Sequence, residues 1–383
     1  MKEDSVKFLH IADTHFGAHY AINPKNLQRR AYGERFFRQT EKIVNEALIQ
    51  HQVDFIIHSG DFFNRSQPPG EVVKRGVEPF VRAASNGVPV YIVAGNHERG
   101  KLPVGLISFH ENIYLFVKPC SFLYRKKGLT VKITGHPYIR EEAPSLFNRV
   151  VQKAQDNFLS TTGSNKIDYN ILATHQLFEG SQVENYTFRT GKNVIGFSQI
   201  PQNYHYIASG HVHRYQVVYK DSGRARSSNG VRKILQDYDS RTWRSSIEEK
   251  TIFNVGTIVC YSGSPDRVSL QERNEPKGYV IGEITSEDAR FNFQQVDATP
   301  ILYQKWDLLS SPLRSYLNEA RDALARLEEI RSKNPAEFAA VFRINIRGRL
   351  SKPTRRLKHL KEEAQRLGVY LTFSSHLDSK LGL

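Results

Sequence analysis

Apolar runs and amphipathic segments alternate along the first quarter of the chain. Residues 6–12, 54–59 and 88–94 are short, nearly continuous apolar runs of the kind that form buried strands. Between these runs, residues 34–51 and 72–84 carry apolar side chains at helical spacing. This alternation predicts a layered α/β domain.

Beyond residue 113 the apolar runs become shorter, and they suggest a second sheet packed on the first. We expect its strands at 114–117, 129–134, 169–173, 206–208, 216–219, 257–261 and 279–284. Residues 221–250 break this rhythm because they are polar and rich in Ser and Arg, with few residues that could form a core. We interpret that segment as a basic surface insertion.

A separate pattern follows residue 295. It predicts a helix at 313–331, a strand at 341–347, a basic helix at 355–367 and a last strand at 369–373. We therefore expect two domains: residues 1–294, which include the insertion, and a small α+β domain at 295–383 that caps the first.

The net charge changes the picture more than the rest of the composition does. The 54 Lys and Arg residues exceed the 39 acidic residues and give a net charge of +15. Such a surplus favours a polyanionic partner, nucleic acid before membrane, although it also serves solubility alone. Two cysteines do not make a disulfide framework, and no apolar stretch is long enough to span a bilayer. We expect a cytoplasmic or nucleoid-associated protein without a signal peptide.

Candidate metal ligands follow five of the predicted strands. The motifs are IADTHFG with Asp13 and His15, HSGDFF with Asp61, VAGNHERG with Asn96 and His97, LATHQLF with His175, and ASGHVHRY with His211 and His213. Carboxylate, imidazole and amide oxygen are ligands of hard to borderline divalent metals. Because open α/β sheets bind ligands at the carboxyl ends of their strands, we expect these groups to meet at one rim.

Local spacing supports a shared rim. Asp13 and His15 are two residues apart, so both project from one side of an extended segment. Glycines come just before several ligands, where the backbone must turn and approach the metals closely: Gly60, Gly95 and Gly210. We take His10 and His58, which lie inside strands, as structural, and His136 as a weaker candidate beside the site.

In this order, the motifs resemble those of the calcineurin-like metallophosphoesterase superfamily: D-x-H, G-D, G-N-H, a lone His and G-H-x-H. Within it the chain is similar to the SbcD-type double-strand-break repair nucleases, the family that includes the meiotic-recombination-eleven nuclease. The segment YSGSPDRVSLQERNEPKGYVIGEI at 261–284 adds to this resemblance, which covers most of residues 6–285. The implied fold is a four-layer α/β/β/α metallophosphoesterase sandwich with a small C-terminal α+β cap domain.

The resemblance also implies a pair of divalent ions, most simply Mn²⁺. One ion would be held by Asp13, His15, Asp61 and His213, and the other by Asp61, Asn96, His175 and His211. Asp61 would then bridge the two ions. Such a pair can polarise a phosphodiester and lower the pKa of a shared water. His97 would protonate the leaving oxygen or steady the transition state.

Three positions near the motifs qualify this assignment. Asn64 stands where many relatives have a histidine, and it can donate a hydrogen bond to phosphate but cannot carry a proton. Glu98 stands where an aspartate is usual, and we expect it to orient His97. Arg65 resembles the phosphate-gripping arginine of the Ser/Thr phosphatases. All three are candidate neighbours of the metals or the phosphate.

These features favour a Mn²⁺-dependent DNA nuclease, a 3′–5′ exonuclease or a single-strand endonuclease or both, that processes DNA ends in double-strand break repair. The alternative enzyme is a phosphatase or phosphodiesterase that acts on another substrate. A catalytically silent DNA-binding or scaffold subunit is a third possibility. The resemblance implies a homodimer and an SMC-like ATPase of the SbcC type as partners. The segments 221–250 and 355–367 are our candidates for contact with the DNA backbone.

Overall fold

A computed structural model of the chain describes most of its residues. The described residues are 5–18, 27–99, 102–103, 110–126, 128–157, 166–183, 186–201, 203–221, 224–227, 257–285, 289–333, 335, 338–348 and 355–373, with backbone only at 27–32, 219–221 and 224–227. They fall into two compact units. The first unit is drawn from 1–18, 36–266 and 274–296, and the second from 19–35, 267–273 and 297–383.

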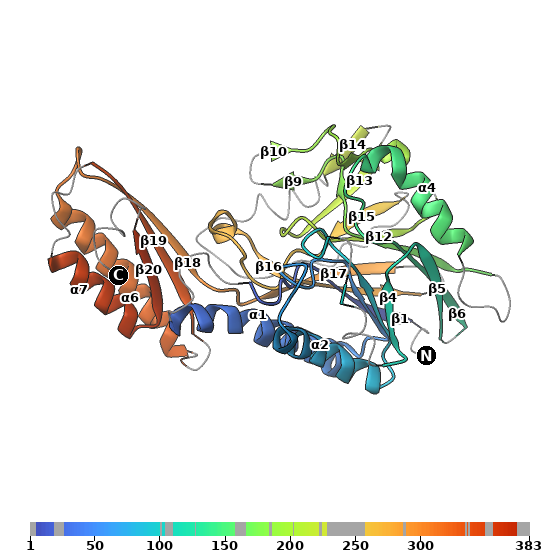
Figure 1. Cartoon of the computed structure of the whole chain (residues 1–383), viewed down its shortest axis with the longest axis horizontal. Coiled ribbons are helices and arrows are strands. Elements are labelled where there is room, and N and C mark those ends of the chain that lie inside the picture. The colour runs from blue at the N-terminus through green and yellow to red at the C-terminus, as the bar shows by residue number, and fades with distance from the viewer. Residues whose placement is uncertain are drawn as a thin grey trace. The chain divides into compact units, whose positions relative to one another are not determined.

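The first unit contains a six-stranded mixed sheet (Figure 1). Its strands, in spatial order, are β17 (Ala289–Val296), β16 (Lys277–Ile284), β1 (Val6–Ile11), β2 (Phe55–His58), β3 (Val90–Val93) and β4 (Ile113–Phe116). The four strands from β1 to β4 are parallel, whereas β16 and β17 are antiparallel to their neighbours. The first unit also holds α2 (Gly70–Ser85), the end of α1 (Leu27–Glu46) and the π-helical turn η1 (Ala47–His51).

A seven-stranded mixed sheet forms the other half of the first unit. Its order is β14 (Arg224–Ser227), β13 (Gln216–Asp221), β15 (Ile258–Tyr261), β12 (Tyr206–Ser209), β7 (Tyr169–Thr174), β6 (Leu129–Gly135) and β5 (Cys120–Lys126). The helix α4 (Ala143–Asp156) accompanies it. Smaller pieces are β8 (Leu177–Phe178) paired with β11 (Val194–Ile195), β9 (Gln182–Val183) paired with β10 (Tyr186–Thr187), and η2 (Phe197–Gln199). The short helix η3 (Leu270–Asn274) belongs almost entirely to the second unit.

Successive side chains along a strand point to opposite faces of its sheet and so pack into different hydrophobic cores. In β2, Ile56 points to the core shared with α1 and α2, while Phe55 and Ile57 point to the core between the two sheets. In β12, Tyr206 enters that same central core, and Ile207 enters a third core that includes residues of α4. The predicted α/β class with a second sheet is therefore confirmed, and both sheets are mixed. The expected membership was wrong for two strands, because β4 and β16 pair with β3 and β1 and so belong to the first sheet.

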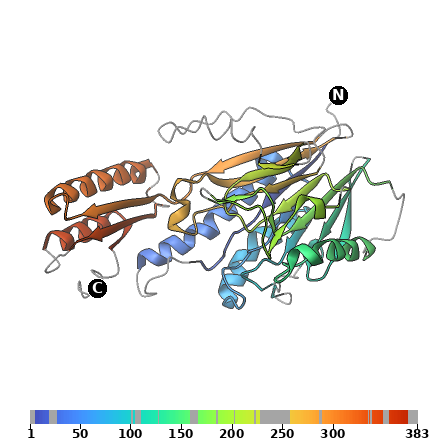
Figure 2. The same cartoon turned by 90° about the horizontal axis from the view of Figure 1, so that it is seen from above.

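The second unit is a three-stranded parallel sheet with two helices. Its strands are β18 (Ile301–Asp307), β19 (Ala340–Arg347) and β20 (Val369–Phe373), with β19 in the middle, and its helices are α6 (Leu313–Lys333) and α7 (Arg355–Arg366). Phe342 and Ile344 of β19 share one core with Leu324 of α6 and Leu360 of α7. Both helices therefore pack on the same face of this sheet, and Figure 2 shows the unit from above.

Several elements differ from the sequence-based prediction. Residues 224–227, which we assigned to a surface insertion, form β14 and pair with β13. The rest of that insertion, apart from Asp221, lies outside the described residues. The pattern also did not predict α4, β5, β17 or β18, whose half-exposed residues mix polar and apolar types. Among the described helices, none has the length and apolarity needed to cross a membrane.

Candidate metal centre

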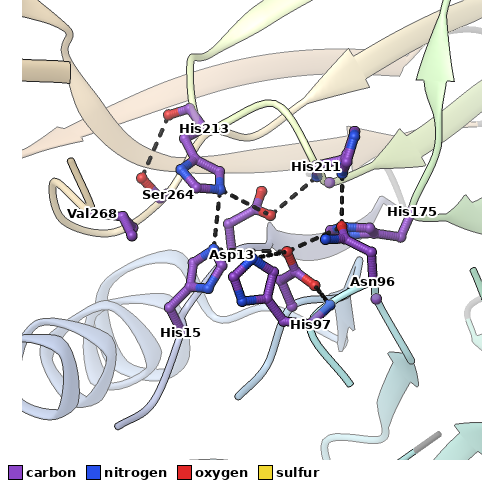
Figure 3. A network of polar contacts seen from close by, with 12 residues as sticks. Asp13, His15, Asn96, His97, His175, His211, His213, Ser264 and Val268 are labelled. Atoms are coloured by element: carbon purple, nitrogen blue, oxygen red, sulfur yellow. Dashed lines mark hydrogen bonds and ion pairs between the residues drawn. The ribbon is translucent and has the colours of Figure 1, made fainter. Parts of the chain in front are cut away.

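The predicted ligands meet at the carboxyl ends of strands from both sheets of the first unit. The loops after β1, β2 and β3 supply Asp13, His15, Asp61, Asn96 and His97. The loops after β7 and β12 in the other sheet supply His175, His211 and His213. In Figure 3 the labelled side chains of this set point toward one another: Asp13, His15, Asn96, His97, His175, His211 and His213. The predicted rim is therefore present.

The backbone is unusual at four of these positions. Asp13, His15, Asp61 and His211 have φ angles of 54°, 43°, 50° and 84°. Non-glycine residues adopt the left-handed region at a cost of order 1–3 kcal/mol each, and such residues cluster at functional sites. Backbone hydrogen bonds hold them there, since Asp13 N–H donates to the Gly60 carbonyl at 3.0 Å and His15 N–H to the Asp61 carbonyl at 3.0 Å.

Two glycines allow the strand ends to approach one another. A Cβ added at Gly95 would collide with the backbone nitrogen and carboxylate of Asp61. A Cβ at Gly60, where φ is +95°, would overlap the ring of His175. A side chain at either position would push ligand-bearing strand ends apart, so glycine is required by the packing of the site.

Asp13, His15, Asp61 and His213 form a first group. One potential ligand atom from each lies within 4.8 Å of those of the other three. His15 Nε2 is 3.0 Å from His213 Nε2 and 3.8 Å from Asp61 Oδ2. His213 Nε2 is 3.8 Å from Asp13 Oδ1.

Asn96, His175 and His211 form a second group beside it. Asn96 Oδ1 lies 2.9 Å from His175 Nε2 and 2.8 Å from His211 Nδ1. Asp61 belongs to both groups, because its Oδ2 is 3.3 Å from His175 Nε2 and 3.8 Å from His15 Nε2.

The donor set fits divalent cations. Ligand atoms bound at about 2.1 Å lie roughly 3.0 Å apart at right angles and about 4.2 Å apart across the ion. The separations of 2.8–3.8 Å within the two groups fall in this range. In addition, the buried Asp13 Oδ2 has no hydrogen-bond partner within the described part of the chain. A buried carboxylate oxygen without a donor needs a cation to offset its desolvation.

Burial and charge set the protonation states of the centre. Burial raises the pKa of Asp13, against the opposing charges of His213 and His175. Burial would also raise the pKa of Asp61, but the neighbouring His175, then His15 and His97, hold it well below its usual value. Asp61 is therefore the stable anion around which both groups gather.

The pKa values of the two histidines in the second group are shifted in opposite directions. Burial opposes the charged form of His175, yet Asp61 and then Asp13 raise the pKa of His175 to about 9. Burial, followed by the charge of His175, lowers the pKa of His211 to about 3. The carboxylates thus attract positive charge into this pocket, which a bound cation would supply in place of a proton.

The structure corrects the expected contact of His97. Its Nδ1 lies 3.0 Å from the backbone carbonyl of Asn64, and its Nε2 lies 3.9 Å from Asp61 Oδ2. The buried Glu98 carboxylate instead accepts the backbone N–H groups of Phe63 and Gly95. Glu98 therefore ties together the loops after β2 and β3, and a main-chain carbonyl orients the imidazole.

The remaining predicted neighbours are Asn64, Arg65 and His136. Arg65 is exposed and Asn64 is half-buried, both in the loop that follows Asp61. His136 is buried and bonds to Thr174 Oγ1 at 3.1 Å and to the Pro137 carbonyl at 2.9 Å. Thr174 directly precedes the candidate ligand His175, so a supporting role for His136 behind that ligand stays a prediction.

The other buried histidines are structural, as predicted. His10 lies between Tyr206 Oη at 2.8 Å and Ser59 Oγ at 2.9 Å. His58 Nε2 contacts Thr14 Oγ1 at 3.0 Å. Burial lowers the pKa of both histidines to about 3, so both remain neutral in the folded protein.

One neighbour of the centre was not predicted. The ring of Tyr138 has its centroid 6.0 Å from that of His175 and 5.9 Å from that of His211. It follows β6, so it too comes from a strand end. Sequence reasoning passed over it because a phenol is not a usual ligand of hard divalent metals.

A buried cluster of carboxylates and imidazoles at converging strand ends, with separations that suit divalent cations, is the kind of site that metal-dependent hydrolases use. The calcineurin-like phosphoesterase family matches residues 6–215, a span that contains every predicted site residue. The chain belongs to this family. The hydrolase class and a divalent-metal site that includes Asp13, His15, Asp61 and His213 agree with this membership.

Among curated proteins, the chain is a distant homologue of several named DNA double-strand break repair protein Mre11. The protein of Methanococcus maripaludis is 23% identical over 304 residues, which are 76% of this chain and 67% of the relative. The protein of Sulfurisphaera tokodaii is 25% identical over 282 residues, 72% of this chain and 65% of the relative. That of Methanosarcina acetivorans is 20% identical over 332 residues, 84% of this chain but 45% of the relative. The aligned parts thus span about half to two thirds of these relatives.

Two solved structures are weakly similar. They are the NAD nucleotidase NadN of Haemophilus influenzae, with a TM-score of 0.35 at 11% identity over 96% of this chain and 68% of that chain, and a dimetal phosphatase from Danio rerio, with a TM-score of 0.35 at 11% identity over 76% and 98%. This likeness is too low to refine the family assignment.

Proposed function

We propose that the protein is a Mn²⁺-dependent DNA nuclease that hydrolyses phosphodiester bonds at DNA ends or in single strands during double-strand break repair. The observation that carries this proposal is the convergence of two ligand groups on the shared carboxylate of Asp61. Distant homology to proteins named for double-strand break repair supports the choice of DNA as substrate.

In this proposal each ligand group holds one ion. Asp13, His15, Asp61 and His213 would hold the first, and Asp61, Asn96, His175 and His211 the second. A pair of divalent ions supplies Lewis acidity to the phosphate and lowers the pKa of a water that attacks it. Asp61 is suited to bridging because its depressed pKa keeps it anionic while it faces both groups.

His97 is placed to act on the substrate rather than on a metal. With a proton on Nδ1, the ring donates to the Asn64 carbonyl, and Nε2 is left facing the centre. A second proton on Nε2 makes the ring a donor toward the leaving oxygen of a bound diester. The side chain is 37% exposed, so it can reach substrate, and its Nε2 lies 3.9 Å from Asp61 Oδ2 at the edge of the centre.

A polyanionic substrate agrees with the charge of the chain, which is +15. On α7, Arg355, Arg356 and Lys358 are exposed, whereas Leu357 and Leu360 are buried in the core of the second unit. The basic face of this helix is our candidate for contact with DNA phosphates. The family resemblance adds a homodimer and an SMC-like ATPase of the SbcC type to the proposed assembly.

A phosphatase acting on another substrate is the second candidate, and Arg65 is the observation that favours it. This arginine is exposed in the loop that follows Asp61, where it can grip a phosphate monoester. A monoester carries one more ionisable oxygen than a diester, so a free guanidinium near the metals benefits it more.

Parallel assays with Mn²⁺ separate the two candidates. Purified protein is incubated with end-labelled linear duplex DNA, with single-stranded DNA and with p-nitrophenyl phosphate, and each reaction is repeated in EDTA. We expect Mn²⁺-dependent shortening or nicking of DNA and slow turnover of the monoester. Rapid hydrolysis of p-nitrophenyl phosphate with intact DNA would replace the nuclease proposal with a phosphatase.

A further inference from the structure

Tyr138 borders the second ligand group without belonging to it. Its backbone N–H donates to the Ala94 carbonyl at 2.9 Å, which fixes it beside the Gly95-Asn96-His97 turn. Its ring lies 6.0 Å from the ring of His175 and 5.9 Å from that of His211, measured between centroids. Its position is therefore set by the same strand ends that set the ligands.

The chemistry of this side chain suits a contact with substrate. Tyr138 is half-buried, whereas the adjacent His175 is fully buried, so Tyr138 is the more accessible of the two to a substrate. An aromatic ring at this place offers a planar stacking surface for a nucleobase or a sugar.

Tyr138 and His97 lie next to different ligand groups. The His97 ring is 4.6 Å from that of His15, a member of the first group, while Tyr138 contacts only the second group among the rings of the centre. A phosphodiester has two ester substituents. With the leaving oxygen on the His97 side, the nucleoside that keeps the phosphate points toward Tyr138.

We propose that Tyr138 is a specificity residue that stacks on the nucleoside retaining the phosphate, and so favours nucleotide diesters over other phosphate esters. This inference rests on the proposed phosphodiester hydrolysis. It adds a residue that discriminates substrates by their organic part, which the metal ligands cannot do because their role is to hold the ions that act on the phosphate.

Two substrates with the same leaving group test the inference. Thymidine 5′-(p-nitrophenyl phosphate) carries a nucleoside, and methyl p-nitrophenyl phosphate carries a methyl group in its place. We expect Y138A to lower kcat/KM on the thymidine diester by about 5- to 100-fold, as expected for the loss of one stacked base. The methyl diester should change by less than about twofold, and Y138F should behave like the wild type on both.

Each other outcome overturns the inference. An equal loss on both diesters in Y138A would show that Tyr138 merely positions His175 and His211. An unchanged rate on both would show that it contacts nothing in the substrate.

A binding assay keeps the inference separate from the proposed function. Affinity for a fluorescent phosphorothioate oligodeoxythymidylate, which resists cleavage, is measured for the wild type, Y138A and Y138F. If the wild type cleaves neither DNA nor the two diesters, the nuclease proposal fails, and a five-fold or larger loss of affinity in Y138A alone would still support stacking. Equal affinity in all three proteins would overturn it.

Discussion

The two units of this protein use charge in opposite ways. In the first unit, Asp13 and Asp61 are 0% and 1% exposed and sit on strained backbone at strand ends. In the second, the charges lie on regular elements and in solvent, as for Arg347, whose side chain is 79% exposed and whose ion pair with Asp307 measures 3.7 Å. Buried charges interact strongly with one another, so replacing one of them has a large effect. Exposed charges each contribute a small and nearly additive amount to stability.

This contrast teaches where single substitutions matter. Each ligand of the metal centre faces several others, so removing one leaves the rest with unbalanced charge. The helices of the second unit keep only their apolar side in a core, and the side chains opposite are replaceable one by one.

The largest effect is expected at the shared carboxylate. Asp61→Asn keeps the shape but removes the anion that faces both ligand groups, so Mn²⁺ binding should weaken strongly and DNA cleavage should fall by at least about a thousandfold. Isothermal titration with Mn²⁺ and a nuclease assay measure the two effects. Asp54→Asn is the matched control, because Asp54 is also a buried carboxylate but lies at the opposite end of β2, where it accepts the Lys7 N–H at 2.8 Å. Loss of Mn²⁺ binding in both variants would contradict the assignment.

His97→Ala should separate chemistry from metal binding. We expect cleavage to fall by about 10²- to 10⁴-fold, as for the loss of a general acid, while Mn²⁺ and DNA affinities stay within about twofold. His359→Ala on α7 serves as the control for removal of an exposed imidazole. A drop in Mn²⁺ affinity in His97→Ala would make His97 a ligand instead.

Glycine substitutions probe how tightly the strand ends are packed. Gly95→Ala should destabilise the protein by about 3 kcal/mol or more, because the new methyl group collides with the Asp61 backbone. Gly70→Ala at the start of α2 meets nothing within 4 Å and should be neutral or slightly stabilising. Urea unfolding of both variants in EDTA measures the difference without a metal contribution. Equal stability of the two would show that the site tolerates rearrangement.

We expect the protein to lose stability in acid because of three buried histidines. His10, His58 and His136 have pKa values lowered to about 3, 3 and 4 by burial, against about 6.5 in the unfolded chain. A lowered pKa stabilises the folded state fully above pH 6.5 and progressively less as the pH falls toward 3–4. Each histidine should contribute about 2 kcal/mol of lost stability between pH 7 and pH 5.

Urea unfolding midpoints at pH 7 and pH 5 measure this loss. His136→Gln keeps a polar partner for Thr174 but cannot be protonated, so its loss should be smaller by about 2 kcal/mol. A loss of stability between pH 7 and pH 5 equal to that of the wild type would show that His136 is not neutral in the folded state.

The smallest effect is expected in the second unit. Removing two exposed cations of α7, Arg355→Ala with Lys358→Ala, should weaken DNA binding by a few-fold and lower the salt slope of log K by about 1.5. The control is Lys74→Ala with Lys153→Ala, which removes two exposed cations from α2 and α4. Equal slopes for the two double variants would remove α7 from the proposed DNA contact.

Sequence patterns predicted the residues of the candidate metal centre better than the hydrogen bonds that hold its neighbouring residues in place. Asp61 and His175 could be placed because apolar runs reveal strand ends and the ligand types are recognisable. The acceptor for His97 could not be predicted, since it is the main-chain carbonyl of Asn64, and any residue there has one. Glu98 was misassigned for a related reason, because its carboxylate pairs with backbone amides whose position depends on the fold.

The missed elements have a different cause. In α4, Ala143, Phe147, Val151 and Ala154 are buried at helical spacing, but Pro144 and several polar residues obscure the stripe. In β18, the buried Trp306 stands among half-exposed neighbours, so alternation is weak. Where an element buries only a few side chains, tertiary contacts rather than local pattern decide its formation.

A chain of two buried side-chain hydrogen bonds connects the sheets near the centre. His10 of β1 bonds to Ser59 at the end of β2 and to Tyr206 of β12. In the centre itself, candidate ligands from one sheet face those from the other, so a bound ion would link the two sheets. Chelators should then do more than stop turnover: they should let the sheets part at a lower temperature, and thermal melting with and without Mn²⁺ would register that loosening as a shift that grows with ion concentration.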